Sequence, residues 1–192
     1  VRSGRDALRL LCTSERSFTD LLEALEAREL WSMKVVVRAW EPRLNPDWEF
    51  RGFVCDGKLC ALSQYNHYVY LPEVVMQRDR VQTAIVQYWE QRIRSRLGAF
   101  SEYVVDFAVL QGTASDDETS PGVCVVELNP FLPTTGAALF DWKVDTEVLR
   151  GSKPFEFRTH AQPLPGLSDM ADVLVQDTVS VREDLKAADM LG

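Results

Sequence analysis

The pattern of apolar and polar residues predicts a chain that begins with helices and then becomes rich in strands. Apolar side chains recur every three or four residues over 17–28, at Phe18, Leu21, Leu22 and Leu25, which predicts an amphipathic helix. The short apolar stretch 7–11 predicts a further helical segment before it. The β-branched run 33–40 predicts a strand.

The segment 48–64 carries the clearest local signal in the sequence. Two runs of strand-forming residues flank Asp56-Gly57, which is the pair favoured in a two-residue type I′ hairpin turn. A hairpin closed by that turn would place Arg51 opposite Leu62.

The same hairpin places Arg51 on one strand face with Glu49 and Phe53. An arginine on a largely apolar face needs an anionic partner, because an unpaired buried charge is costly. Two partners remain open from the residues alone, namely a salt bridge to the adjacent Glu49 or a bound phosphate group.

A long helical pattern follows over 72–97, with Pro72 suited to its first turn and Gly98 suited to its end. Its apolar residues, at Val74, Val81, Ile85, Tyr88, Trp89, Ile93 and Leu97, keep roughly helical spacing. This stripe is most simply explained as core packing.

Two later strands carry the candidate chemistry. The run 122–126, apolar or small throughout, predicts a buried strand that ends by presenting Glu127 and Asn129, two residues apart, on one face. The run 103–109 predicts a second strand, in which Asp106 is the single charged residue. If the strands pair, three oxygen-bearing side chains converge, and oxygen ligands are what Mg²⁺ prefers. The alternative is that Glu127 and Asn129 end a strand in water while Asp106 caps a bend.

The remaining segments carry weaker signals. The polar stretch 111–121 predicts a loop, and aromatic residues within 131–142 predict a closure of the lower core. Alternation over 155–158 predicts an edge strand, and a weak helical pattern occupies 181–191.

Composition restricts the class of protein without naming its chemistry. The chain has 192 residues, of which 46% are apolar and 26% charged, values that are ordinary for a soluble globular domain. A net charge of −8 argues against nucleic-acid or anionic-membrane binding through bulk electrostatics. Neither a signal peptide nor an apolar run of membrane-spanning length is present, and the four cysteines indicate reduced thiols. Walker A, G-x-S-x-G and zinc-binding patterns are absent.

Several motifs, taken in order, resemble one known family. They are Val-Val-Arg-Ala-Trp at 36–40, Glu-Phe-Arg-Gly-Phe-Val at 49–54, Leu-Ser-Gln-Tyr at 62–65, Val-Asp at 105–106, Val-Glu-Leu-Asn-Pro-Phe at 126–131 and Leu-Phe-x-Trp at 139–142. In this order and spacing the chain resembles the cell division cycle protein 123 family, an ATP-grasp clade, over roughly residues 12–149.

The resemblance implies an α+β fold of ATP-grasp type, with a mostly antiparallel sheet and flanking helices. Residues 1–150 would form an ATP-grasp-like domain that lacks part of its N-terminal subdomain, and 151–192 a C-terminal extension. By the same resemblance Mg²⁺ would be held by Asp106, Glu127 and Asn129. The nucleotide ATP would be contacted by Arg51, Arg38 and Trp40.

The function implied is ATP-dependent assembly of eukaryotic translation initiation factor two in the cytoplasm, through its gamma subunit. Two alternatives stay open: an ATP-grasp ligase acting on RNA or peptide, and a non-catalytic remnant that serves as a structural subunit. Catalytic residues are not assigned, because the chain shows no acceptor-substrate site. The chain also departs from the family's pattern. Glu127 replaces an aspartate and Thr135-Gly136 replaces Thr-Asp. By the same resemblance, the region with the phosphate-binding lysine would be absent.

Overall fold

The computed structural model describes residues 3–26, 34–111 and 121–163, and the chain divides into two units after Trp40. The N-terminal unit contains the predicted helices, α1 (Gly4–Thr13) and α2 (Glu15–Glu26). Ser3 caps α1, since its Oγ accepts a hydrogen bond from the backbone N–H of Asp6 at 3.2 Å.

The predicted strand over 33–40 is wrong. Residues 34–40 form neither strand nor helix, and the valines at 35–37 are exposed. A β-branched run becomes a strand only where another strand's backbone can pair with it. Within the described part of its own unit, the regular elements are the helices α1 and α2.

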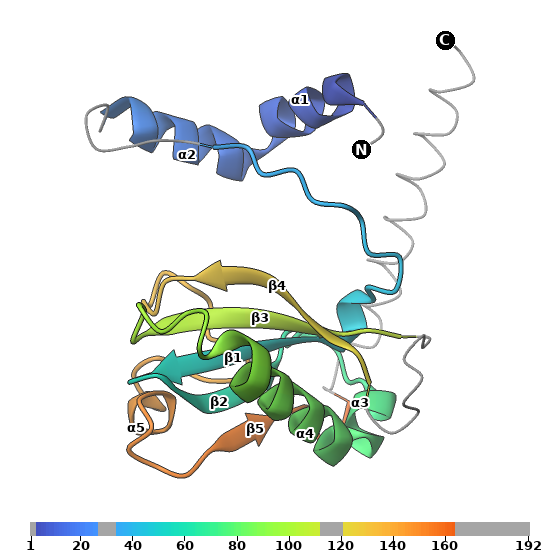
Figure 1. Ribbon diagram of the computed structural model, residues 1–192, viewed down its shortest axis with the longest axis vertical. Helices are drawn as coiled ribbons and strands as arrows, with labels where there is room; N and C mark the ends of the chain where they lie inside the picture. Colours follow the sequence, from blue (N-terminus) through green and yellow to red (C-terminus); the bar gives the residue numbers. More distant parts are fainter. Residues whose placement is uncertain (1–2, 27–33, 112–120, 164–192) are drawn as a thin grey trace. The chain divides into compact units, whose positions relative to one another are not determined.

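The second unit is built on a five-stranded sheet (Figure 1). Its strands are β1 (Glu49–Cys55), β2 (Lys58–Gln64), β3 (Tyr103–Val109), β4 (Val123–Asn129) and β5 (Glu156–Arg158). The spatial order is β4-β3-β1-β2-β5, and every pair is antiparallel except β2 with β5. The α+β class and the edge strand near 155–158 are therefore confirmed.

The hairpin turn is confirmed, whereas its register is not. Asp56 and Gly57 have φ values of 50° and 64°, as a type I′ turn requires. Val54 pairs with Leu59 but Phe53 pairs with Ala61, so Cys60 is an extra residue that forms a β-bulge. The bulge moves the pairing by one position, and Arg51 lies opposite Ser63 instead of Leu62.

The predicted helix over 72–97 is present but interrupted. It consists of α3 (Pro72–Met76), α4 (Arg78–Tyr88) and a π-helical turn, η2 (Trp89–Ile93), with a break at Gln77. In Figure 1, α4 lies across one face of the sheet, where its buried side chains join the larger apolar cluster. This cluster includes Phe50, Val54, Leu62, Val81, Ile85, Trp89, Val105 and Phe107. The stripe is therefore core packing, as predicted.

The opposite face carries a second apolar cluster beneath the chain between β4 and β5. Phe53 and Val104 of the sheet pack there against Phe140 and the short helix α5 (Thr146–Leu149). The Phe53 ring meets the rings of Phe140 and Trp142 edge-on, at centroid separations of 5.6 Å each. These contacts confirm that aromatic residues within 131–142 close the core.

Several predictions fall partly or wholly outside the described residues. The loop 111–121 is described only at its ends, and the helical pattern over 181–191 is not described. No disulfide joins any of the four cysteines. Among the described residues, no helix has the length and apolar composition needed to cross a membrane.

Candidate functional site

Three neighbouring strands place four of the predicted site residues on one face of the sheet. Arg51 of β1 lies opposite Asp106 of β3, and Asp106 lies opposite Glu127 of β4. Asn129 follows Glu127 by two residues and projects from the same face. The structure therefore brings together the residues for which the sequence predicts a metal site and an adjacent arginine.

A β-bulge in β4 makes this arrangement compatible with the core. Asp106 pairs with Glu127 but Phe107 pairs with Val125, so Val126 is the extra residue. With strict alternation Val125 and Glu127 would share a face. Because of the bulge, Val125 packs against the larger apolar cluster while Glu127 faces the other side. The sequence pattern did not predict this bulge.

The centre of the site is a closed ion pair between Arg51 and Asp106. The Nε and Nη2 atoms of Arg51 each donate to one Asp106 carboxylate oxygen at 2.8 Å, a bidentate geometry. The two side chains are only 9% and 2% exposed. The partner of Arg51 is thus a carboxylate, as one alternative held, but it belongs to Asp106 and not to Glu49.

The amide of Asn129 joins the two acidic residues of the candidate metal site. Its Nδ2 atom donates to Asp106 Oδ2 and to Glu127 Oε1, both at 3.2 Å. Two carboxylates and one amide therefore meet within hydrogen-bonding distance. Asp106 is buried, while Glu127 is exposed at the rim.

Negative charge exceeds positive charge around this cluster. Burial raises the pKa of Asp106, and Glu127 adds to this effect while the Arg51 ion pair opposes it. Burial also raises the pKa of Glu49, followed by repulsion from Asp106 and Glu127. Three mutually repelling carboxylates thus gather where one guanidinium pairs with Asp106, and this oxygen-rich set fits a hard divalent cation such as Mg²⁺.

Glu49 provides a test of this charge imbalance. The pKa of Glu49 is higher in the folded protein than in the unfolded chain. At a pH above the folded pKa, the ionised side chain therefore destabilises the folded state, and at a pH below the unfolded pKa this destabilisation disappears. Glu49→Gln should therefore increase the free energy of unfolding at pH 8, by less than about 1 kcal/mol because the group is partly solvated. Urea unfolding at pH 8 and again near pH 4, where the gain should disappear, checks this.

Glu147→Gln is a matched control for that experiment. Glu147 is an exposed glutamate whose pKa is lowered by Lys153, so its ionised form favours folding and its removal should not stabilise the protein. Two results would contradict charge repulsion at Glu49 as the cause: an equal gain in the free energy of unfolding in both variants, or a gain in Glu49→Gln that persists near pH 4.

Two further residues complete the surroundings of Arg51, and the sequence analysis did not identify them. Nη1 of Arg51 donates to the carbonyl oxygen of Gly136 at 2.6 Å, and the guanidinium lies 4.7 Å from the centre of the Tyr65 ring. Tyr65 directly follows β2 within the Leu-Ser-Gln-Tyr motif, so an aromatic residue at a strand end was an available signal. A backbone carbonyl such as that of Gly136 leaves no signal in the sequence.

The structure does not decide the roles predicted for Arg38 and Trp40. Both belong to the N-terminal unit, where Trp40 is 80% exposed, and their contact with a nucleotide stays a prediction.

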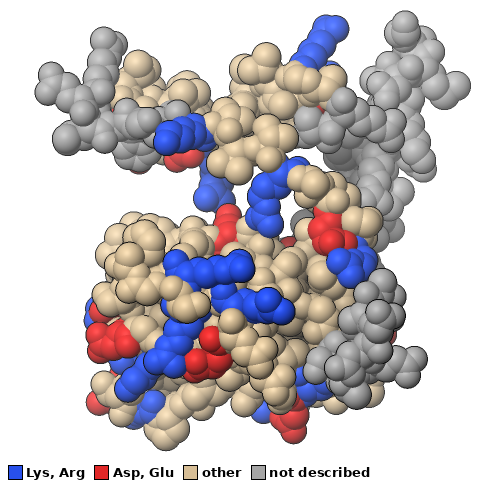
Figure 2. Space-filling model, viewed as in Figure 1, with Lys and Arg blue, Asp and Glu red and all other residues tan. Residues whose placement is uncertain are grey.

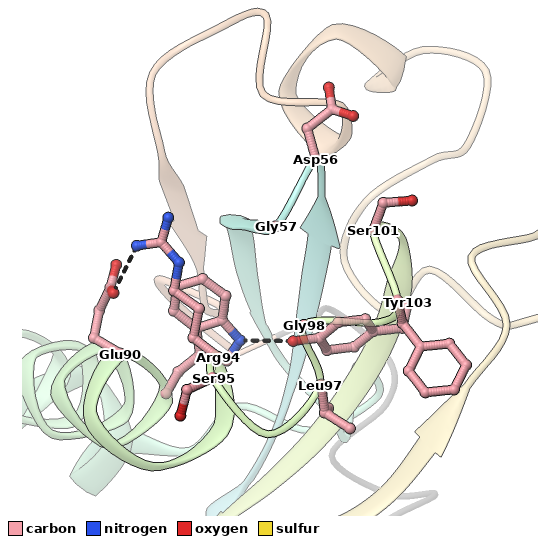
Figure 3. A pocket seen from close by; sticks show the side chains of 11 residues that line it. Asp56, Gly57, Glu90, Arg94, Ser95, Leu97, Gly98, Ser101 and Tyr103 are labelled. Atoms are coloured by element: carbon pink, nitrogen blue, oxygen red, sulfur yellow. Dashed lines mark hydrogen bonds and ion pairs between the residues drawn. The ribbon is translucent and has the colours of Figure 1, made fainter.

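A surface hollow of about 540 Å³ lies at a different place in the sheet unit (Figure 3). It lies between the Asp56-Gly57 turn and the residues that follow α4, with the hydrogen-bonded pair Trp89 and Tyr103 on its wall. Figure 2 shows basic side chains gathered on one face of this unit. The hollow itself is lined by Asp56, Glu90 and Arg94, so it offers no net positive charge to an anion.

Cys55, Asp56 and Glu102 also approach one another, with possible ligand atoms within 4.8 Å. Burial raises the pKa of Cys55 to about 11, with Glu102 adding to the effect. A thiol held protonated is a poor metal ligand, because the thiolate is the form that binds metals. A metal ion here would therefore have to displace the thiol proton, whereas the Asp106 site offers carboxylate and amide oxygens.

The sequence model of a family described as D123 matches residues 2–165. This match covers most of the chain. The chain belongs to the D123 family.

Curated relatives of this D123-family chain carry consistent names. A protein of Lodderomyces elongisporus named translation initiation factor eIF2 assembly protein is 29% identical over 112 residues, covering 57% of this chain and 27% of its own length. Cell division cycle protein 123 of Phaeosphaeria nodorum is 33% identical over 110 residues, covering 56% of this chain and 26% of its own. The chain thus spans about a quarter to a third of the length of the curated relatives it matches.

A solved structure has a similar fold. Cdc123 from Schizosaccharomyces pombe matches with a TM-score of 0.59 and 20% identity, over 83% of this chain and 63% of that one. The likeness confirms the α+β fold with a mostly antiparallel sheet and flanking helices.

Proposed function

We propose that this chain binds Mg²⁺ and ATP as part of an ATP-grasp domain and serves in the assembly of a translation initiation factor. The observation that carries the proposal is the convergence of Asp106, Glu127 and Asn129 beside the guanidinium of Arg51. Three oxygen-bearing side chains beside a cation form a suitable set for a metal-chelated polyphosphate.

Each residue would have a distinct role in such a complex. Asp106 and Glu127 would supply carboxylate oxygens to the ion, and Asn129 would turn its amide oxygen toward it. Arg51 is oriented by Asp106 and by the Gly136 carbonyl, and the second N–H of its Nη1 atom would face a phosphate oxygen. The ion, when bound, would neutralise phosphate charge and fix its orientation.

The names of the curated relatives support the partner. The relatives from Lodderomyces elongisporus and Dictyostelium discoideum, among others, are named translation initiation factor eIF2 assembly protein. The partner would be eukaryotic initiation factor two, and the family resemblance adds the gamma subunit as the contact and the cytoplasm as the location. A copurification of this chain with the isolated gamma subunit, compared with the alpha and beta subunits, tests this part of the proposal.

The hydrogen bonds of Arg51 favour a second function, that of a structural subunit without a bound nucleotide. All three of its guanidinium nitrogens already donate hydrogen bonds within the protein. A buried ion pair of this kind can stabilise a fold without any ligand. The chain would then be a structural subunit of a larger assembly, and it would show no affinity for ATP.

Isothermal titration with Mg²⁺ and ATP distinguishes these functions. The unaltered chain should release binding heat that requires Mg²⁺. Glu127→Gln should weaken this binding at least about tenfold, because it removes a charged oxygen ligand from the rim of the site. Glu127 is exposed, so the substitution should leave the stability of the fold almost unchanged.

Glu147→Gln serves as the control, because it removes the same charge from an exposed position on α5. Its affinity for Mg²⁺ and ATP should equal that of the unaltered chain. Equal weakening by both substitutions would indicate only a change in overall charge. An absence of binding heat in the unaltered chain would favour the structural subunit.

A further inference from the structure

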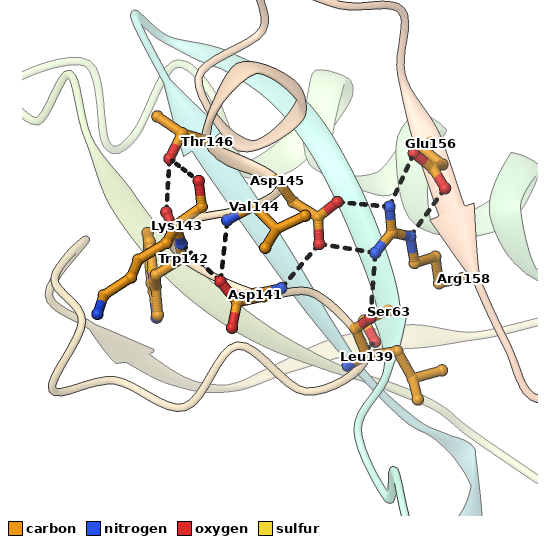
Figure 4. A network of polar contacts seen from close by, with 10 residues as sticks. All are labelled: Ser63, Leu139, Asp141, Trp142, Lys143, Val144, Asp145, Thr146, Glu156 and Arg158. Atoms are coloured by element: carbon orange, nitrogen blue, oxygen red, sulfur yellow. Dashed lines mark hydrogen bonds and ion pairs between the residues drawn. The ribbon is translucent and has the colours of Figure 1, made fainter.

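The last strand of the sheet carries an arginine whose hydrogen-bonding capacity is fully used (Figure 4). Arg158 donates from Nη1 and Nη2 to the two carboxylate oxygens of Asp145, each at 2.8 Å. Its Nε and Nη2 donate to Glu156, at 2.8 and 3.3 Å, and its Nη1 donates to the carbonyl of Leu139 at 3.2 Å. A guanidinium has five N–H groups, and all five are engaged here.

These contacts hold the chain between β4 and β5 at several points. Asp145 also accepts from the backbone N–H of Asp141 at 2.8 Å, and the Leu139 N–H donates to Ser63 Oγ at 3.1 Å. The Arg158 guanidinium stacks 4.1 Å from the centre of the Phe140 ring. Arg158 thus fixes both the backbone and one aromatic anchor of residues 139–145.

The segment held in this way reaches the candidate site. Trp142 Nε1 donates to the carbonyl of Thr135 at 2.6 Å, which connects residues 139–145 to the preceding turn. The next carbonyl, that of Gly136, accepts the Arg51 donor Nη1, which Asp106 does not use. A continuous chain of hydrogen bonds and covalent bonds therefore runs from Arg158 to Arg51.

We propose that Arg158 is a positioning residue for the candidate site, which acts by holding residues 136–145 so that Gly136 fixes the orientation of Arg51. The inference rests on the proposed function only in the consequence for ATP. The ordering of the Arg51 side chain through Arg158 does not depend on whether the chain binds ATP.

Arg158→Lys tests the proposal, because lysine keeps the charge but has no planar fork to hold Asp145, Glu156 and Leu139 together. In the altered chain, hydrogen exchange of the backbone over 134–145 and of the Arg51 Nε–H should become at least about tenfold faster. Exchange within α4, on the other face of the sheet, should not change. Asp145→Asn is a second variant, which weakens the same contact while Arg158 keeps Glu156.

Arg150→Lys is the matched control. Arg150 also pairs with a carboxylate, that of Glu102 at 3.0 Å, and also stacks near an aromatic ring, that of Phe131 at 5.4 Å. Its substitution should leave the exchange of the Arg51 Nε–H unchanged. If Arg158→Lys and Asp145→Asn likewise leave that exchange unchanged, or if α4 loosens to the same extent, Arg158 is not a positioning residue.

A double-mutant cycle tests the consequence for ATP. As a single substitution, Arg158→Lys should weaken the binding of Mg²⁺ and ATP about fivefold. In a chain that already carries Arg51→Lys, the same substitution should cause no further weakening. Additive losses would overturn the proposed route through Arg51. If the unaltered chain shows no ATP binding, the proposed function fails, and the exchange of the Arg51 Nε–H still decides whether Arg158 positions that residue.

Discussion

Arg51→Met should lower the free energy of unfolding by about 3–5 kcal/mol, because it leaves the Asp106 carboxylate buried without its partner. Methionine has a similar length, so the loss arises mainly from the missing charge and hydrogen bonds. The Gly136 carbonyl also loses its donor. Urea unfolding followed by tryptophan fluorescence measures the change.

Two further variants show whether the charge is the cause. Arg150→Met removes an exposed arginine from an ion pair and should cost less than about 1 kcal/mol. Adding Asp106→Leu to Arg51→Met should recover a large part of the loss, since an apolar pair can replace a buried ion pair. A cost of under 1 kcal/mol for Arg51→Met would show that the pair does not stabilise the fold.

The common face of the site could be predicted because it depends on local alternation. Glu127 and Asn129 are two residues apart, and a strand places such residues on one side whatever lies around it. Asp106 was identifiable as the single charged residue in an apolar run. Pairing two strands that follow each other along the chain then brings these side chains together.

The partner of Arg51 could not be predicted in the same way, because it depends on the order of strands in space. β1 pairs with β3 as well as with β2, and that contact joins residues 55 positions apart in the chain. The bulges at Cys60 and Val126 are also invisible in the sequence, although each moves side chains by one position. Glu49 was the nearest acid in sequence, but it is not the ion-pair partner.

The wrong strand over 33–40 has the same origin. Its valines favour extended backbone, but a strand is stabilised by a neighbour that accepts its hydrogen bonds. The strand propensity of these residues describes the segment alone, and it contains no information about whether a second strand is available to pair with it.

The packing of Phe53 connects the stability of the sheet to the geometry of the site. Phe53 lies two residues after Arg51 on the same strand face and is completely buried. Its ring supports both Phe140 and Trp142, which belong to the segment that carries the Gly136 carbonyl. The same segment is held from the other side by Arg158.

Phe53→Ala should therefore cost about 3–5 kcal/mol of stability and should also loosen residues 136–142 in the protein that remains folded. Removing the ring leaves a cavity beneath two aromatic anchors, so hydrogen exchange over this segment should increase more than exchange in α4. Ile85→Ala is the control, because Ile85 is equally buried in the cluster on the opposite face and should cost about 2–5 kcal/mol. If both variants loosen residues 136–142 to the same degree at equal loss of stability, the segment follows the global stability of the sheet. A selective effect of Phe53→Ala would mean that the aromatic contacts of this one face, together with Arg158, determine how rigidly Arg51 is held.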